Sequence, residues 1–180
     1  SGVCPAGKVC ASKTIEPVEC PVGAYCAVGS GSPTACEAGS FGNATGLRGA
    51  AECHRCEAGF WCSAGVAIPC GLGTYNEEVG TSDQSACTYC PSRSFTRNES
   101  TTSIANCICE EGHYALWHNA TLECAVCPVG ANCTESGATF EHLPLQEGYW
   151  RANSDTTDVR RCPGNTDGSA CIGCIGVACA

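Results

Sequence analysis

The sequence predicts a small disulfide-rich fold, an elongated tandem array of cysteine-rich repeats with short two-stranded β ribbons and almost no helix. The 180-residue chain contains 20 cysteines, a density typical of disulfide scaffolds rather than of domains with one large apolar core. Its 22 glycines and 9 prolines interrupt the chain often, and no segment has helical periodicity. Units this small bury little apolar surface, so disulfides are expected to hold them together.

Sixteen of the cysteines share one frame, in which glycine follows an opening cysteine by three positions and an aromatic residue follows it by five. The glycine occurs in seven of eight openings, with Arg93 in the eighth, and the aromatic residue occurs in six. One further cysteine follows each opening, early in short loops and late in long ones. Repeats 1 to 8 open at Cys4, Cys20, Cys36, Cys56, Cys70, Cys90, Cys109 and Cys127. The spacing of about 18 residues indicates a solenoid-like array whose repeats contact their neighbours.

Three segments follow from the frame. Residues 1–35 hold short Cys-x5-Cys loops, residues 36–133 add the long loops, and residues 134–180 lack cysteine until a terminal cluster. The glycine lets the chain turn back, and the aromatic residue is expected to cover the disulfide. Local closure is the simplest pairing of the short loops, although a crossed Cys4–Cys20 and Cys10–Cys26 arrangement is an alternative that the sequence leaves open. Local closure gives the pairs Cys4–Cys10, Cys20–Cys26, Cys56–Cys62 and Cys127–Cys133.

The cysteine-poor stretch at 134–161 is the largest departure from the frame. Its apolar residues predict a strand or hairpin that packs on its neighbours, and Tyr149 and Trp150 form the alternative, an exposed contact patch. The cysteines after this stretch lie outside the frame and are expected to pair among themselves, with their connectivity open. They are Cys162, Cys171, Cys174 and Cys179.

Part of the chain resembles known extracellular repeats. The run from Cys70 to Cys124 resembles the cysteine-rich region of ephrin receptors, on its CGLGTY opening, its CPSRS continuation and its CICEEGHY step. The long loops are similar to the first module of tumour-necrosis-factor-receptor repeats, and the CICEEGHY step is similar to the end of an epidermal-growth-factor (EGF-like) module. The resemblance covers residues 36–133. It implies the pairs Cys36–Cys53, Cys70–Cys87, Cys90–Cys107 and Cys109–Cys124. The units at Cys4 and Cys20 depart from this pattern and resemble cysteine-rich surface proteins of protists.

Four Asn-x-Ser/Thr sequons predict N-linked glycans, three of them within long loops. The acceptor residues are Asn43, Asn98, Asn119 and Asn132. Sequons and dense cysteines together predict a secreted or cell-surface protein that passes through the secretory pathway. The net charge of −9 disfavours nucleic acid and anionic membranes as partners. No apolar run is long enough to span a bilayer.

Enzymatic and metal chemistry are not predicted. The Cys-x-x-Cys spacings join the closing cysteine of one repeat to the opening cysteine of the next, as at Cys53 and Cys56, so these thiols are expected to be oxidised and not to bind zinc. No histidine pairing, nucleophile elbow or phosphate loop is present. We therefore expect no cofactor and no catalytic residue.

Two functions fit this pattern. The first is a non-enzymatic structural glycoprotein of an extracellular fibre, appendage or cell-surface coat, with self-association or other extracellular proteins as partners. The second is a ligand-binding or spacer ectodomain of a cell-surface receptor or adhesin. Repeats of this kind serve as spacers in many proteins, so the fold does not decide between the two.

Overall fold

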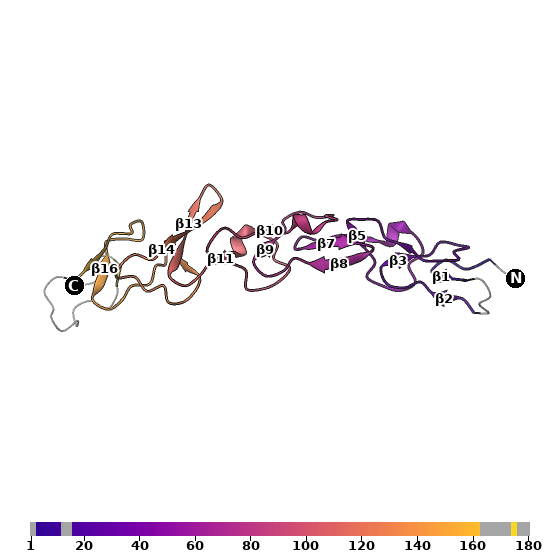
Figure 1. The fold of residues 1–180 in the computed structure, drawn as a ribbon, viewed down its shortest axis with the longest axis horizontal. Helices are drawn as coiled ribbons and strands as arrows, with labels where there is room; N and C mark the ends of the chain where they lie inside the picture. The colour runs from indigo at the N-terminus through magenta and orange to yellow at the C-terminus, as the bar shows by residue number, and fades with distance from the viewer. Residues whose placement is uncertain (1–2, 12–15, 163–173, 176–180) are drawn as a thin grey trace. The chain divides into compact units, whose positions relative to one another are not determined.

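A computed structural model describes residues 3–11, 16–162 and 174–175. The chain forms two compact units, unit 1 (Ser1–Tyr89 and Asn98–Ser103) and unit 2 (Cys90–Arg97 and Ile104–Ala180). Short antiparallel strand pairs follow one another within each unit (Figure 1). The part of the chain that is described contains three one-turn 3₁₀ helices and no α-helix. The predicted class, a small disulfide-rich fold with short antiparallel ribbons in tandem, is confirmed.

Within unit 1, the residues that the structure describes form five antiparallel pairs and two of the 3₁₀ helices. In most pairs the first strand is the dipeptide after the frame glycine and the second is the dipeptide before the next opening cysteine. The pairs are β1 (Lys8–Val9) with β2 (Val18–Glu19), β3 (Ala24–Tyr25) with β4 (Thr34–Ala35), β5 (Ser40–Phe41) with β6 (His54–Arg55), β7 (Phe60–Ser63) with β8 (Val66–Pro69), and β9 (Thr74–Tyr75) with β10 (Thr88–Tyr89). The helices are η1 (Ala50–Glu52) and η2 (Gln84–Ala86).

The described residues of unit 2 form one ribbon, two three-stranded sheets and the helix η3 (Ile104–Asn106). The ribbon pairs β11 (Ser94–Phe95) with β12 (Ile108–Cys109). The first sheet has the order β14 (Thr121–Val126), β13 (His113–His118), β15 (Ala138–Thr139), and the second has the order β17 (Val159–Arg161), β16 (Tyr149–Arg151), β18 (Cys174–Ile175). Strand β15 runs parallel to β13, and β18 runs parallel to β16, so a crossover connection precedes β15 and β18.

Half-cystines are ten of the seventeen buried apolar residues, and several are fully buried. The frame aromatics contribute less than expected, because they are half-buried in the paired strands and only Tyr114 is buried. The predicted strand within 134–161 exists as β16 and β17, and Leu143 of this stretch packs in a cluster with Tyr114. This cluster is a small apolar core of unit 2.

The predicted segments 1–35, 36–133 and 134–180 are defined by the kind of cysteine loop that each contains. This division of the chain stays a prediction. Of the tail cysteines, Cys162 takes part in a disulfide. Cys171 and Cys179 lie outside the described residues, and Cys174 is described only for its backbone. The pairing of the tail is therefore still an expectation.

Candidate functional site

The junction between successive repeats is the feature that the frame builds most regularly. At the junction of repeats 4 and 5, the Gly59 N–H donates to the Asn76 carbonyl at 2.8 Å, and the Cys70 N–H donates to the Gly59 carbonyl at 2.8 Å. The glycine thus bonds the next repeat through both of its backbone groups. The same two bonds recur at the frame glycines Gly7, Gly23, Gly39 and Gly112.

A second pair of backbone bonds closes the same junction. The Gly80 N–H donates to the Cys56 carbonyl at 2.7 Å, and the Cys62 N–H donates to the Thr81 carbonyl at 2.9 Å. Equivalent bonds join repeat 1 to repeat 2 and repeat 2 to repeat 3. Four hydrogen bonds between fixed positions therefore connect each of these repeats to the next, while each disulfide stays within its own repeat.

A second glycine position supports the junction, nine or ten residues after the opening cysteine. Its residues have positive φ, the left-handed backbone region in which glycine alone is unstrained. The position holds Gly29, Gly46, Gly65, Gly80 and Gly137, with Ser100 at φ 57° in repeat 6. Sequence reasoning missed this position, although the recurrence of glycine there was the signal.

The turn at this second glycine position packs against the frame glycine of the repeat two places earlier in the chain. A Cβ added at Gly39 would lie 2.3 Å from the Gly80 carbonyl oxygen, and one added at Gly59 would lie 2.3 Å from the Ser100 carbonyl oxygen. Both distances are too short for any side chain. At Gly39 and Gly59 the frame glycine is therefore required by close backbone packing as well as by its positive φ.

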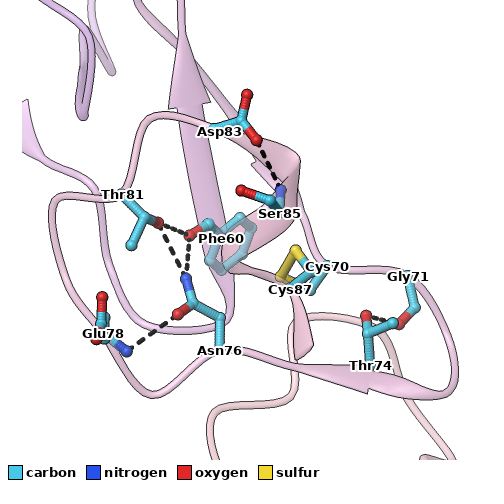
Figure 2. The surroundings of a disulfide bond; sticks show 10 residues. All are labelled: Phe60, Cys70, Gly71, Thr74, Asn76, Glu78, Thr81, Asp83, Ser85 and Cys87. Atoms are coloured by element: carbon cyan, nitrogen blue, oxygen red, sulfur yellow. Dashed lines mark hydrogen bonds between the residues drawn. A yellow bond between two sulfur atoms is a disulfide. The ribbon is translucent and has the colours of Figure 1, made fainter. Parts of the chain in front are cut away.

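The sixth position after the opening cysteine is buried in seven of the eight loops, and the exception is the half-buried Cys10. Short loops place their second cysteine there, whereas long loops place a small or polar residue, such as Asn76 and Thr96, each 2% exposed. The Asn76 side-chain amide donates to the Phe60 carbonyl at 2.8 Å and to the Thr81 hydroxyl at 3.0 Å, as Figure 2 shows. Its side-chain oxygen accepts a bond from the Glu78 N–H at 3.0 Å. This amide joins repeat 5 to repeat 4 at the position that a half-cystine occupies in the short loops.

The structure closes every framed cysteine loop within its own repeat. The short disulfides are Cys4–Cys10, Cys20–Cys26, Cys56–Cys62 and Cys127–Cys133, and the long ones are Cys36–Cys53, Cys70–Cys87, Cys90–Cys107 and Cys109–Cys124. A loop of about 15 residues gains roughly 3 kcal/mol from its bridge in the chain-entropy model. The local bridges therefore stabilise each repeat, and the backbone junctions order the repeats along the chain.

The four sequon asparagines are all exposed. Asn43 and Asn98 lie in the long loops of repeats 3 and 6, and Asn119 lies in the turn between β13 and β14. Asn132 accepts a hydrogen bond from the Thr134 hydroxyl at 2.8 Å through its side-chain oxygen. Exposure gives an oligosaccharide access to each of these side chains.

Tyr149 and Trp150 lie in β16 and are half-buried. A Cβ at Gly130 would lie 2.2 Å from a Tyr149 ring carbon, so this ring packs directly on the Gly130 backbone. The next residue, Arg151, is fully buried and donates to the Phe140 and Glu141 carbonyls at 2.8 and 2.6 Å. Burial lowers the pKa of the Arg151 guanidinium, and the charge of Asp155 partly opposes this.

A hollow of about 920 Å³ in unit 1 is lined by Trp61, Leu72 and Tyr89 together with polar residues of η2. Among its lining residues is Asp83, whose carboxylate accepts the Ser85 N–H at 2.8 Å and caps η2. These hydrogen bonds to Ser85 lower the pKa of the Asp83 carboxyl. The hollow is lined by aromatic rings, hydroxyls and the Asp83 carboxylate. Because that carboxylate already accepts the Ser85 N–H, the lining suits surface contact rather than acid–base chemistry.

The residues that the structure describes contain no cluster of three metal-binding side chains. Among those same residues, no helix is long and apolar enough to cross a membrane.

No family model matches the chain. Over 102 residues the chain is 32% identical to Signal peptide, CUB and EGF-like domain-containing protein 2 of the zebrafish Danio rerio. The match covers 53% of this chain and 10% of that protein, so the chain spans about a tenth of the length of the curated relative it matches. With its eight framed disulfides, the chain is a cysteine-rich repeat module similar to part of a protein named for EGF-like domains.

Proposed function

We propose that the chain is a non-enzymatic structural glycoprotein module of an extracellular fibre, appendage or cell-surface coat. The recurring backbone junction carries this proposal. Each framed repeat in unit 1 bonds to the next through main-chain groups at fixed positions, so an array can be lengthened without a new interface. Such an arrangement suits a spacer or a building element.

The chemistry of the chain supports an oxidising, secretory route. Eight disulfides within the described residues persist only where thiols are not kept reduced. The zebrafish protein that the chain partly matches carries "signal peptide" in its name. N-linked glycans at Asn43, Asn98, Asn119 and Asn132 belong to the same proposal, because all four side chains are exposed. Partners would be further copies of the chain or other extracellular proteins.

Electron microscopy of native material tests the structural role, with static light scattering of the purified protein as a second measurement. We expect fibres or sheets in the native material and association in solution. A monodisperse monomer at all concentrations, with no ordered assembly in the native source, would refute the proposal.

A ligand-binding or spacer ectodomain is the second candidate, because Tyr149 and Trp150 keep part of their surface exposed on β16. Trp150→Ala should then abolish capture of an extracellular partner while the disulfide map stays unchanged. If the substitution instead releases the protection of β16 and β17 against amide exchange, the indole is part of the unit 2 core. Val129→Ala is a matched control, because that side chain is 83% exposed in the same unit.

A further inference from the structure

The hairpin formed by β13 and β14 exposes an aromatic side chain beside a sequon. Trp117 is 45% exposed and lies directly opposite Leu122, which is 2% exposed. Directly opposite side chains of an antiparallel pair share one face of the ribbon. The indole therefore lies beside the buried Leu122 and keeps much of its own surface in solvent.

The sequon begins at the tip of this hairpin. Asn119 and Ala120 have φ values of 47° and 63°, the two positive values of a type I′ turn, and they connect the directly opposed His118 and Thr121. Thr121, the last residue of the sequon, starts β14. Figure 1 shows this hairpin projecting from its neighbours in unit 2. The acceptor asparagine is thus fixed in position by a tight turn.

The acceptor asparagine and the tryptophan are close along the chain, with only His118 between them. Residues 117 and 119 are two positions apart, which corresponds to about 6.6 Å along an extended strand. N-acetylglucosamine has a face made of axial C–H groups, and an indole offers a large, flat apolar partner. Trp117, His118, Asn119 and Ala120 are all exposed, so the tip of the hairpin is open to solvent.

We propose that the hairpin tip is a glycan platform, in which the first N-acetylglucosamine on Asn119 packs its C–H face on the Trp117 indole. This rests on the proposed glycosylation of the chain and adds a contact to it. The sugar then covers an exposed aromatic surface and orders the hairpin, so the glycan becomes part of the fold at this site. The other sequons lack this arrangement. Asn98 and Asn132 follow no aromatic residue by two positions. Asn43 follows Phe41 by two positions, but Phe41 is less exposed than Trp117 and Asn43 does not lie in a hairpin turn.

The test uses the whole chain secreted from eukaryotic cells, with glycans trimmed enzymatically to a single N-acetylglucosamine. Peptide mass spectrometry measures occupancy at each sequon. NMR then measures contacts between sugar protons and the indole of Trp117, together with amide exchange in β13 and β14. We expect upfield-shifted sugar protons and about fivefold slower hairpin exchange than in the Asn119→Gln variant, similar to the effect of one aromatic contact.

Two variants separate stacking from simple attachment. Trp117→Ala should remove the shifts and the slowing while Asn119 stays occupied, and Trp117→Phe should retain part of both. His118→Ala is the matched control, because His118 lies on the other face opposite Thr121, and it should change neither. Occupied Asn119 with equal slowing in Trp117→Ala and wild type overturns the platform. An empty Asn119 in a chain glycosylated elsewhere also overturns it and leaves the glycoprotein proposal intact, whereas four empty sequons overturn both.

Discussion

Replacing Gly59 with alanine is expected to disrupt the junction between repeats 4 and 5. The residue has φ 82°, and a left-handed backbone costs an alanine about 1 kcal/mol. The new Cβ would lie 2.3 Å from the Ser100 carbonyl oxygen, so the two backbones must separate by about 1 Å to reach ordinary contact. That movement weakens the bonds from Gly59 to Asn76 and from Cys70 to Gly59, each contributing about 1 kcal/mol. The expected loss is about 3 kcal/mol of local stability.

Native-state amide exchange measures this loss, because a repeat array can open locally without unfolding throughout. Gly73→Ala is the matched control. Gly73 occupies the same frame position in repeat 5 with φ 77°, but a Cβ there meets nothing within 4 Å, so only the backbone cost of about 1 kcal/mol applies. Equal effects of the two substitutions would refute the argument that close packing between repeats requires the frame glycine.

Three further outcomes are expected. Asn76→Ala removes a buried donor to the Phe60 carbonyl and should cost about 2 kcal/mol, measured as faster exchange in the 76–87 loop with its disulfide intact. Arg151→Lys replaces a guanidinium that donates to both the Phe140 and Glu141 carbonyls with a single ammonium group. The substitution should destabilise β16 by about 2 kcal/mol, measured by denaturant titration. The hydrogen bonds from Ser85 lower the pKa of the Asp83 carboxyl in the folded chain. The Asp83 cap therefore stabilises η2 fully at pH values above the ordinary pKa of 3.8, and this stabilisation is lost as the pH falls through the lower pKa of the folded state. An NMR titration midpoint for Asp83 at or above 3.8 would contradict this.

The sequence predicts the fold class well because cysteine spacing is a direct record of loop size. The frame glycine and the dipeptide after it also identify the strands, as at Gly73 and β9. The junctions are harder to predict, because backbone groups form them and leave no residue-type signature except the second glycine. Ser100 obscures even that signal in repeat 6.

The candidate site was less accessible to sequence reasoning for a different reason. In the sequence, Asn76 looks like an ordinary loop asparagine. Only its burial and its hydrogen bond to the Phe60 carbonyl show that it links repeat 5 to repeat 4. The aromatic residues were expected to cover the disulfides, but in strands of two residues they remain half-exposed. Tyr149 and Trp150 are half-buried in β16, and amide exchange in the Trp150→Ala variant separates the core interpretation from the contact interpretation.

The unequal loops give the chain an uneven response to pulling. A closed disulfide removes its loop from the length that tension can extend, so only the connectors between loops can lengthen. Cys10 and Cys20 are ten positions apart, which permits about 35 Å of extended chain, whereas Cys53 and Cys56 are three positions apart and permit about 10 Å. Repeats with short loops therefore act as extensible segments under load, and repeats with long loops act as stiff ones until their disulfides are reduced.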